Sequence, residues 1–249
     1  MKCCPESQLD SLDYGYIHKS NIMSLVTTHD NEFIFTGGNN GELRQWRCDS
    51  ELQVHDYSPA HKYWIRAMSV TPDDKYLFTG SEDFVLKQWD IQGKKLYKQY
   101  LDYAKHSIDS MIITSNMEFL FTGTHNGCLK KLALKKELTY EFGEKASERK
   151  SRPIHKAPVK SLLITKDNEY LLSADKSGTI VQWSVSTHTF VREFPRFLAK
   201  GITTIHLTED GNRIVSVLGN QTLIAFPLSE MFAGHTANDK GKKKNQMTG

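Results

Sequence analysis

The sequence is sparing in cysteine and has no long apolar run. Its 249 residues include four cysteines, a content that fits a reducing compartment. No stretch approaches the roughly 18 consecutive apolar residues of a membrane span. Met1–Glu6 carries no apolar signal core. These absences exclude secretion and membrane insertion from our expectations. They favour a cytoplasmic protein, with a nuclear or cytoskeletal location as the alternative.

The sequence also lacks the motifs of common catalytic and cofactor sites. It contains no nucleophile elbow, phosphate loop, zinc-ligand spacing or glycine-rich dinucleotide fingerprint. The net charge of +3 is mild and implies no general affinity for polyanions. We therefore expect no catalytic residues, no cofactor, no metal and no small-molecule substrate. Four aspartates that resemble catalytic groups recur at one turn position: Asp30, Asp73, Asp167 and Asp210.

What the sequence does contain is an internal repeat. In five places an apolar residue is followed 21 positions later by Trp or another large apolar residue. The copies follow one another at a period of 43 residues, except for a step of 51 between the third and the fourth. A spacing held through five copies indicates one repeated supersecondary unit, with insertions confined to connectors. The pairs are Leu25–Trp46, Met68–Trp89, Met111–Leu132, Leu162–Trp183 and Ile205–Phe226.

Each copy has the periodicity of short strands. In the second copy, Thr71–Asp74 and Ser81–Asp83 are turn signals that separate runs of apolar and β-branched residues. Four antiparallel strands in about 43 residues are typical of one propeller blade. The sequence thus predicts an all-β propeller of five four-stranded blades. The strands expected in the second copy are 65–70, 75–80, 84–89 and 94–100.

Three segments carry a shared motif. They are Thr-Gly-x-x-Asn-Gly-x-Leu-x-Gln-Trp at 36–46, Thr-Gly-Ser-Glu-Asp-x-x-Leu-x-Gln-Trp-Asp at 79–90 and Ser-Ala-x-x-x-Gly-Thr-Ile-x-Gln-Trp at 173–183. A histidine precedes the first strand of four copies, at His18, His61, His106 and His155. With these features the chain resembles the WD40-repeat family over about residues 8–230.

The resemblance implies a hydrogen-bonded structural tetrad of His, Ser or Thr, Asp and Trp within each blade. Only the second copy matches at all four positions, with His61, Thr79, Asp83 and Trp89. Such a tetrad satisfies buried polar groups, so we interpret these histidines as structural rather than catalytic. The departures are Asn40, Asn126 and Ser177 for the Asp, Leu132 and Phe226 for the Trp, Leu198 for the His, and a displaced His106.

The fifth copy shows no strand signal after Phe226. Residues 8–14, however, align in phase with 51–57, which form the expected fourth strand of the first copy. An N-terminal strand paired with Leu223–Phe226 would complete the fifth blade and close the ring. The alternative is an open arc completed by another chain or by sequence not present here. The expected organisation is a flexible segment 1–7, repeats over 8–230 and a basic, disordered tail 231–249.

Some positions vary while the frame around them repeats. The residue after the first apolar position of each first strand is Met23, Arg66, Asp109, Lys160 or Thr203. This is a rim position in propellers, and variation within a constant frame suits specific recognition. The second copy adds two aromatic residues, of types enriched at interfaces, although Trp64 could instead pack on the neighbouring blade. The candidate partner-binding residues are Tyr63, Trp64, Arg66, Asp109 and Lys160.

Two basic segments raise an RNA alternative. The inserted connector 143–153 and the tail could contact phosphates, or could be a tolerated loop and a solubilising tail. The sequence thus predicts a non-enzymatic protein-interaction scaffold or subunit of a larger assembly, with a subunit of an RNA–protein complex as the alternative. The candidate basic contacts are Arg149, Lys150, Arg152, Lys242, Lys243 and Lys244.

Overall fold

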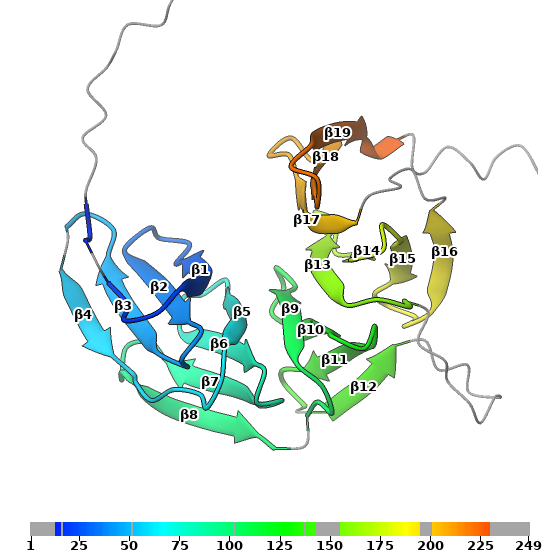
Figure 1. Cartoon of the computed structure of the whole chain (residues 1–249). Coiled ribbons are helices and arrows are strands. Elements are labelled where there is room, and N and C mark those ends of the chain that lie inside the picture. Colours follow the sequence, from blue (N-terminus) through cyan, green and yellow to red (C-terminus); the bar gives the residue numbers. More distant parts are fainter. Residues whose placement is uncertain are drawn as a thin grey trace, which may run out of the picture. The chain divides into compact units, whose positions relative to one another are not determined.

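The computed structural model describes residues 13–15, 17–50, 52–101, 103–136, 138–142, 155–194 and 201–229. The described residues contain 19 strands in five antiparallel sheets (Figure 1). The predicted all-β fold of five propeller blades is therefore confirmed. No helix in this part of the chain is long and apolar enough to cross a membrane. The chain divides into two compact units, Met1–Lys105 and His106–Gly249.

The first unit holds two four-stranded blades. Blade 1 has the order β1-β2-β3-β4 and blade 2 the order β5-β6-β7-β8, so each strand pairs with its neighbours in sequence. The strands are β1 (Ile22–Thr27), β2 (Phe33–Gly38), β3 (Leu43–Arg47), β4 (Gln53–Asp56), β5 (Ile65–Val70), β6 (Tyr76–Ser81), β7 (Leu86–Asp90) and β8 (Lys95–Tyr100).

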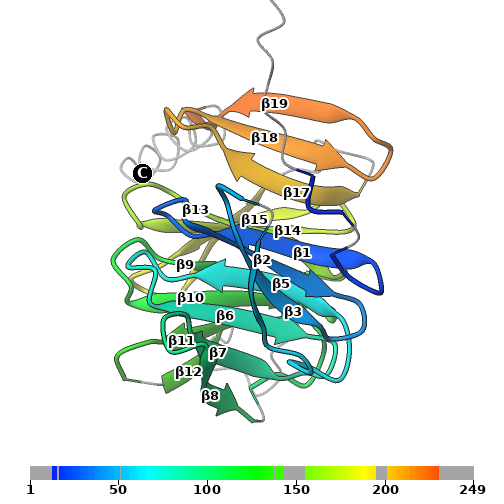
Figure 2. The ribbon, with the colours of Figure 1, turned by 90° about the vertical axis from the view of Figure 1, so that its left-hand side faces the viewer.

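The second unit holds three blades, of which the last has three strands. Figure 2 shows β17, β18 and β19 lying side by side in that sheet. Blade 3 comprises β9 (Ile108–Ile113), β10 (Phe119–Thr124), β11 (Leu129–Ala133) and β12 (Leu138–Phe142). Blade 4 comprises β13 (Val159–Ile164), β14 (Tyr170–Asp175), β15 (Ile180–Ser184) and β16 (Phe190–Phe194). Blade 5 comprises β17 (Ile202–Leu207), β18 (Arg213–Leu218) and β19 (Leu223–Pro227).

The apolar core lies between neighbouring blades of each unit. Blades 1 and 2 enclose one cluster that includes Phe35 and Trp89. Blades 3 and 4 enclose a second cluster, and blades 4 and 5 a third. Serine hydroxyls on the first strands also join adjacent blades, because Ser24 Oγ donates to Ile65 O at 2.9 Å and Ser110 Oγ to Val159 O at 3.0 Å. Neighbouring blades in both units are thus joined by the same combination of apolar packing and serine hydrogen bonds.

Two left-handed backbone positions recur in every blade. They lie ten residues apart in the turns before and after the second strand. This conformation costs an ordinary L-residue about 1–2 kcal/mol, whereas glycine adopts it freely. The first position is Asn31, Asp74, Met117, Asn168 or Gly211, with φ between +54° and +75°. The second is Gly41 (φ +80°), Phe84 (+69°), Gly127 (+86°), Gly178 (+92°) or Gln221 (+67°).

The expected strands of the second copy agree with the structure to within two residues at their ends. The largest difference is at the third strand, expected to start at Phe84 and observed to start at Leu86. Phe84 belongs instead to the preceding turn, where its amide donates to Ser81 O at 3.2 Å. Its left-handed backbone is incompatible with an extended strand.

The N-terminal strand expected to close the fifth blade falls almost wholly outside the described residues. Tyr14 is described, and its ring packs edge-on against Trp46 at a centroid distance of 6.0 Å. Tyr57, 43 residues later, packs in the same way on Trp89 at 5.4 Å. Tyr14 therefore occupies the same place in the repeat as Tyr57. The pairing of residues 8–14 with Leu223–Phe226 stays a prediction.

Candidate functional site

The expected tetrad of blade 2 forms a continuous hydrogen-bonded group. His61 Nε2 lies 2.7 Å from Thr79 Oγ1, and His61 Nδ1 lies 2.9 Å from Asp83 Oδ2. Trp89 Nε1 donates to the same threonine oxygen at 2.9 Å. The His61 side chain is 0% exposed. Since the imidazole is sealed inside the blade, these residues have no access to a substrate.

Blades 1 and 4 contain equivalent groups that the sequence alignment missed. In blade 4, His155 Nδ1 lies 3.0 Å from Asp175 Oδ2, two residues before the expected position at Ser177. In blade 1, His18 Nδ1 lies 3.2 Å from Glu42 Oε2, two residues after Asn40. The sequence could have indicated these partners by a carboxylate near the turn glycine, either before it, as Asp175 is, or after it, as Glu42 is. A side chain at either position can reach the histidine.

Burial and pairing set the protonation states of the blade 2 tetrad. Desolvation lowers the pKa of His61, although hydrogen bonding to Asp83 partly offsets this. Burial alone would raise the pKa of Asp83, but hydrogen bonds from His61 and from backbone amides bring it down to about 2. At neutral pH the pair is a neutral imidazole hydrogen-bonded to a carboxylate. A buried pair in this state stabilises the fold of the blade.

The five variable positions share a local geometry. In each first strand the register with the second strand shifts at this residue, so each is the extra residue of a β-bulge. A bulge turns a side chain away from the regular pleat, which explains why the residue type at these positions can vary while the rest of the repeat stays constant. The bulge residues are Met23, Arg66, Asp109, Lys160 and Thr203.

In the first unit the predicted residues Tyr63, Trp64 and Arg66 lie together with Glu82, which the sequence did not single out. We call the surface formed by these four residues the aromatic rim. The Arg66 guanidinium lies 4.5 Å over the Trp64 ring, and its Nε donates to Glu82 Oε1 at 3.0 Å. Tyr63 is 58% exposed beside them. A stacked, ion-paired arginine is held in one orientation. The rim is therefore a preorganised surface.

In the second unit the structure brings Asp109 and Lys160 together. Lys160 Nζ lies 2.7 Å from Asp109 Oδ2, and the exposed His125 contributes its Nδ1 to the same oxygen at 3.1 Å. Ser107 Oγ donates to Asp109 Oδ1 at 2.8 Å. Burial would raise the pKa of Asp109, but Lys160 and Ser107 lower it below its usual value. Asp109 is thus engaged within the unit, and Lys160 and His125 form the accessible part of this cluster.

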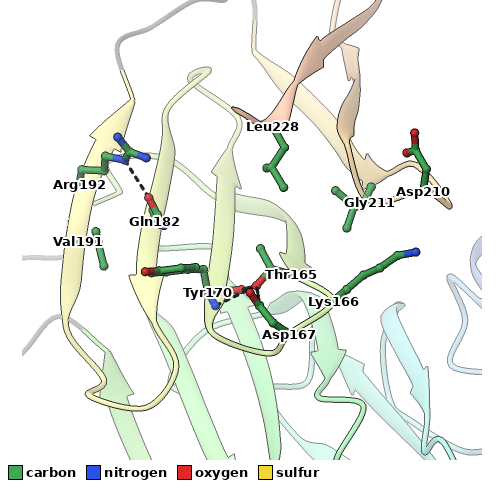
Figure 3. A pocket seen from close by; sticks show the side chains of 11 residues that line it. Thr165, Lys166, Asp167, Tyr170, Gln182, Val191, Arg192, Asp210, Gly211 and Leu228 are labelled. Atoms are coloured by element: carbon green, nitrogen blue, oxygen red, sulfur yellow. Dashed lines mark hydrogen bonds between the residues drawn. The ribbon is translucent and has the colours of Figure 1, made fainter. Parts of the chain in front are cut away.

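A cavity of about 660 Å³ lies between blades 4 and 5. Figure 3 shows Arg192 hydrogen-bonded to Gln182 on one wall and Lys166 near Asp210 on another. Nothing in the sequence marks this cavity, because its walls come from two blades. Its carboxylates, Asp167 and Asp210, accept hydrogen bonds within their own turns. The other lining residues are Thr165, Tyr170, Val191, Leu207, Gly211 and Leu228.

Lys131 is a second feature that sequence reasoning missed. It replaces the glutamine found at Gln45, Gln88 and Gln182 and is fully buried between blades 3 and 4. Its ammonium lies 3.3 Å over the Phe119 ring and donates to His188 Nε2. Desolvation lowers the pKa of Lys131 to about 8, against a small opposing effect of Glu118.

We expect this lysine to give the protein an alkaline gain in stability. The unfolded chain holds the lysine proton up to about pH 10.5, whereas the folded chain releases it near pH 8. Between these values the free energy of unfolding rises with pH, by up to a few kcal/mol. Lys131→Gln, which restores the residue of the other blades, should abolish the rise in urea denaturation from pH 7.5 to 10.5. An identical rise in the variant would contradict this assignment.

The candidate basic contacts lie outside the described residues. These are Arg149, Lys150 and Arg152 in the connector and Lys242, Lys243 and Lys244 in the tail, so the RNA alternative stays a prediction. Among the residues that the structure describes, no cluster of three or more His, Cys, Asp or Glu side chains could hold a metal ion. The aromatic rim, the Asp109–Lys160 cluster and the cavity are thus the candidate sites.

Comparisons with known proteins point to a repeat family. Residues 13–47, 52–90 and 147–184 match the family model of the WD domain, G-beta repeat (WD40). No curated protein matches the chain. Among solved structures, the β-propeller domain of Cps50 (Swd1) from Myceliophteria thermophila is similar, with a TM-score of 0.71 and 15% identity. The match covers 85% of this chain and 66% of that one, just under two thirds, and shows the fold alone.

Proposed function

We propose that the chain is a non-enzymatic scaffold that binds another protein through its aromatic rim, because three of its segments match the WD40 repeat and such propellers generally serve as interaction scaffolds. The observation that carries this proposal is the stacked and ion-paired Arg66 beside the exposed Tyr63. Tyrosine, tryptophan and arginine dominate the binding energy of many protein interfaces. The protein would act in the cytoplasm as a subunit of a larger assembly.

The geometry of the tetrads supports a scaffold over an enzyme. The tetrad histidines of blades 1, 2 and 4 are each paired with a carboxylate inside their own blade, where each group satisfies its neighbour. The rim residues, by contrast, lie on bulges and connectors outside this frame. In a binding platform, a constant interior is expected to maintain the fold while variable rim residues contact the partner.

Trp64→Ala should weaken binding of the protein partner about tenfold or more, since it removes both the ring and the support of Arg66. The partner would be identified by crosslinking in cells and its affinity measured with purified proteins. Tyr97→Ala is the matched control, because Tyr97 is 56% exposed on β8 of the same blade. Unchanged affinity of a folded Trp64→Ala protein would remove the rim from the interface.

A salt titration separates this proposal from the RNA alternative. Binding of a single-stranded RNA through the basic segments would weaken steeply as salt rises, because counterions are released on phosphate contact. Specific RNA binding that persists in Trp64→Ala and is lost when the basic segments are neutralised would favour the RNA–protein complex. Absence of RNA binding at low salt would remove that alternative.

A further inference from the structure

Each blade repeats one pair of positions where the chain enters its first strand. The first position is the bulge residue, and the second is the residue immediately after the second strand. The amide of the second position donates to the carbonyl of the residue before the first strand in every blade, at 2.7–3.0 Å. The backbone geometry of the pair is therefore constant. The pairs are Met23 and Asn39, Arg66 and Glu82, Asp109 and His125, Lys160 and Lys176, and Thr203 and Gly219.

In blades 2 and 3 the two side chains of the pair are complementary and in contact. Arg66 Nε donates to Glu82 Oε1 at 3.0 Å in blade 2. In blade 3, His125 Nδ1 lies 3.1 Å from Asp109 Oδ2. The shared backbone geometry thus brings the two side chains of a pair within reach of each other, and one member of each of these pairs is a carboxylate.

Blade 4 has two lysines at these positions, which we call the lysine pair, Lys160 and Lys176. Like charges on adjacent strands repel, and Lys160 Nζ pairs instead with Asp109 Oδ2 of the neighbouring blade at 2.7 Å. Lys176 is exposed, and no ion pair involves its ammonium within the part of the chain that the structure describes. The adjacent Asp175 is buried and paired with His155. Blade 4 therefore lacks the carboxylate that blades 2 and 3 have at this place.

The lysine pair suits a single anionic side chain better than a nucleic acid. An ammonium group has three N–H donors, so Lys160 can donate to a second anion while it stays paired with Asp109. The Asp109 side chain is only 1% exposed and presents little charge of its own to that anion. A nucleic acid is bound by cations spread along its backbone. The equivalent pair of the adjacent blade 5, Thr203 and Gly219, is uncharged.

We propose that the lysine pair binds an anionic side chain of a partner protein, either a carboxylate or a phosphorylated residue. The anion accepts charge-assisted hydrogen bonds from the Lys160 and Lys176 ammonium groups. It supplies to blade 4 the negative charge that Glu82 supplies to blade 2. This site belongs to the second unit and does not depend on the aromatic rim, so it adds a separate contact of stated chemistry to the proposed function.

Lys176→Glu tests this because it supplies the missing carboxylate within the blade. The probe is an oligoglutamate peptide titrated by calorimetry, and its affinity should fall about tenfold. The urea midpoint should not fall, since an opposite-charge pair replaces a like-charge pair. Lys136→Glu is the matched control, because Lys136 is another exposed lysine of the same unit and the change in net charge is equal. That control should change the affinity less than about twofold.

A peptide rich in phosphoserine and a single-stranded RNA complete the experiment. Binding of either peptide that is lost in Lys176→Glu supports the proposal, and the tighter of the two peptides identifies the anion. Equal losses from Lys176→Glu and Lys136→Glu would mean that the peptides respond only to net charge, which overturns it. So would no binding of either peptide, or RNA that binds more tightly than both and is lost in Lys176→Glu. Trp64→Ala should leave peptide binding unchanged, so failure at the lysine pair would not count against the aromatic rim.

Discussion

Asp175→Ala lowers the free energy of unfolding by about 3–5 kcal/mol, the cost of leaving one member of a buried pair alone. Asp175 and His155 are both 0% exposed and lie 3.0 Å apart. Asp175 also accepts hydrogen bonds from the Thr179 amide at 3.0 Å and from Ser177. The substitution therefore strands an imidazole N–H and a turn amide in the interior. Urea denaturation at neutral pH measures the loss.

Asp49→Ala is the control for this loss. Asp49 accepts two hydrogen bonds from the Arg47 guanidinium, but both side chains are at the surface. Exposed ion pairs contribute little to stability because solvent screens them. The control should leave the denaturation midpoint nearly unchanged. Similar losses from both substitutions would mean that the blade 4 tetrad does not stabilise the fold in the way that its burial indicates.

Gly127→Ala lowers the free energy of unfolding by about 2–4 kcal/mol, through backbone strain and a direct overlap. Gly127 has φ +86°, which an alanine adopts only at a cost. A Cβ at this position would also overlap the backbone carbonyl of His155, which belongs to the connector entering blade 4. Because that connector carries the tetrad histidine, it cannot move aside without disturbing the His155–Asp175 pair. Thermal and urea unfolding both report the effect.

Gly211→Ala isolates the strain from the overlap. Gly211 has φ +75°, but the nearest atoms to an added Cβ belong to the flexible Lys166 side chain, at 3.2 Å. This substitution should cost about 1 kcal/mol, from the backbone alone. If Gly127→Ala cost no more than Gly211→Ala, the contact between the blade 3 turn and the His155 connector would not be rigid.

Local chemistry explains why so much of the frame can be predicted from the sequence. A strand buried on one or both faces shows its own apolar pattern, and a left-handed turn selects Gly, Asn or Asp at its own position. Gly41 and Gly127 follow this rule, and the apolar runs correctly locate β5 to β8. Phe84 breaks it, which is why β7 starts later than its apolar pattern suggests.

The sites were less predictable, because their partners come from different strands or blades. Asp175 and Glu42 complete their tetrads although each lies two residues from the position expected for the tetrad carboxylate, at Ser177 and Asn40. A side chain can reach the histidine from before or after that position. Asp109 and Lys160 were both expected at a rim, but their 2.7 Å contact depends on how blades 3 and 4 pack. The bulges that aim these residues are features of pairing, which no single strand specifies.

The sequence by itself determined the repeat, the strands, the turns and the division between a constant frame and variable positions. All of these follow from short-range periodicity and turn chemistry. Only the tertiary structure decided which carboxylate completes the tetrads of blades 1 and 4, that Lys131 is buried against Phe119 and that Phe84 takes a left-handed turn position. The physical reason is that burial, electrostatic environment and side-chain reach depend on residues brought together from separate strands and blades.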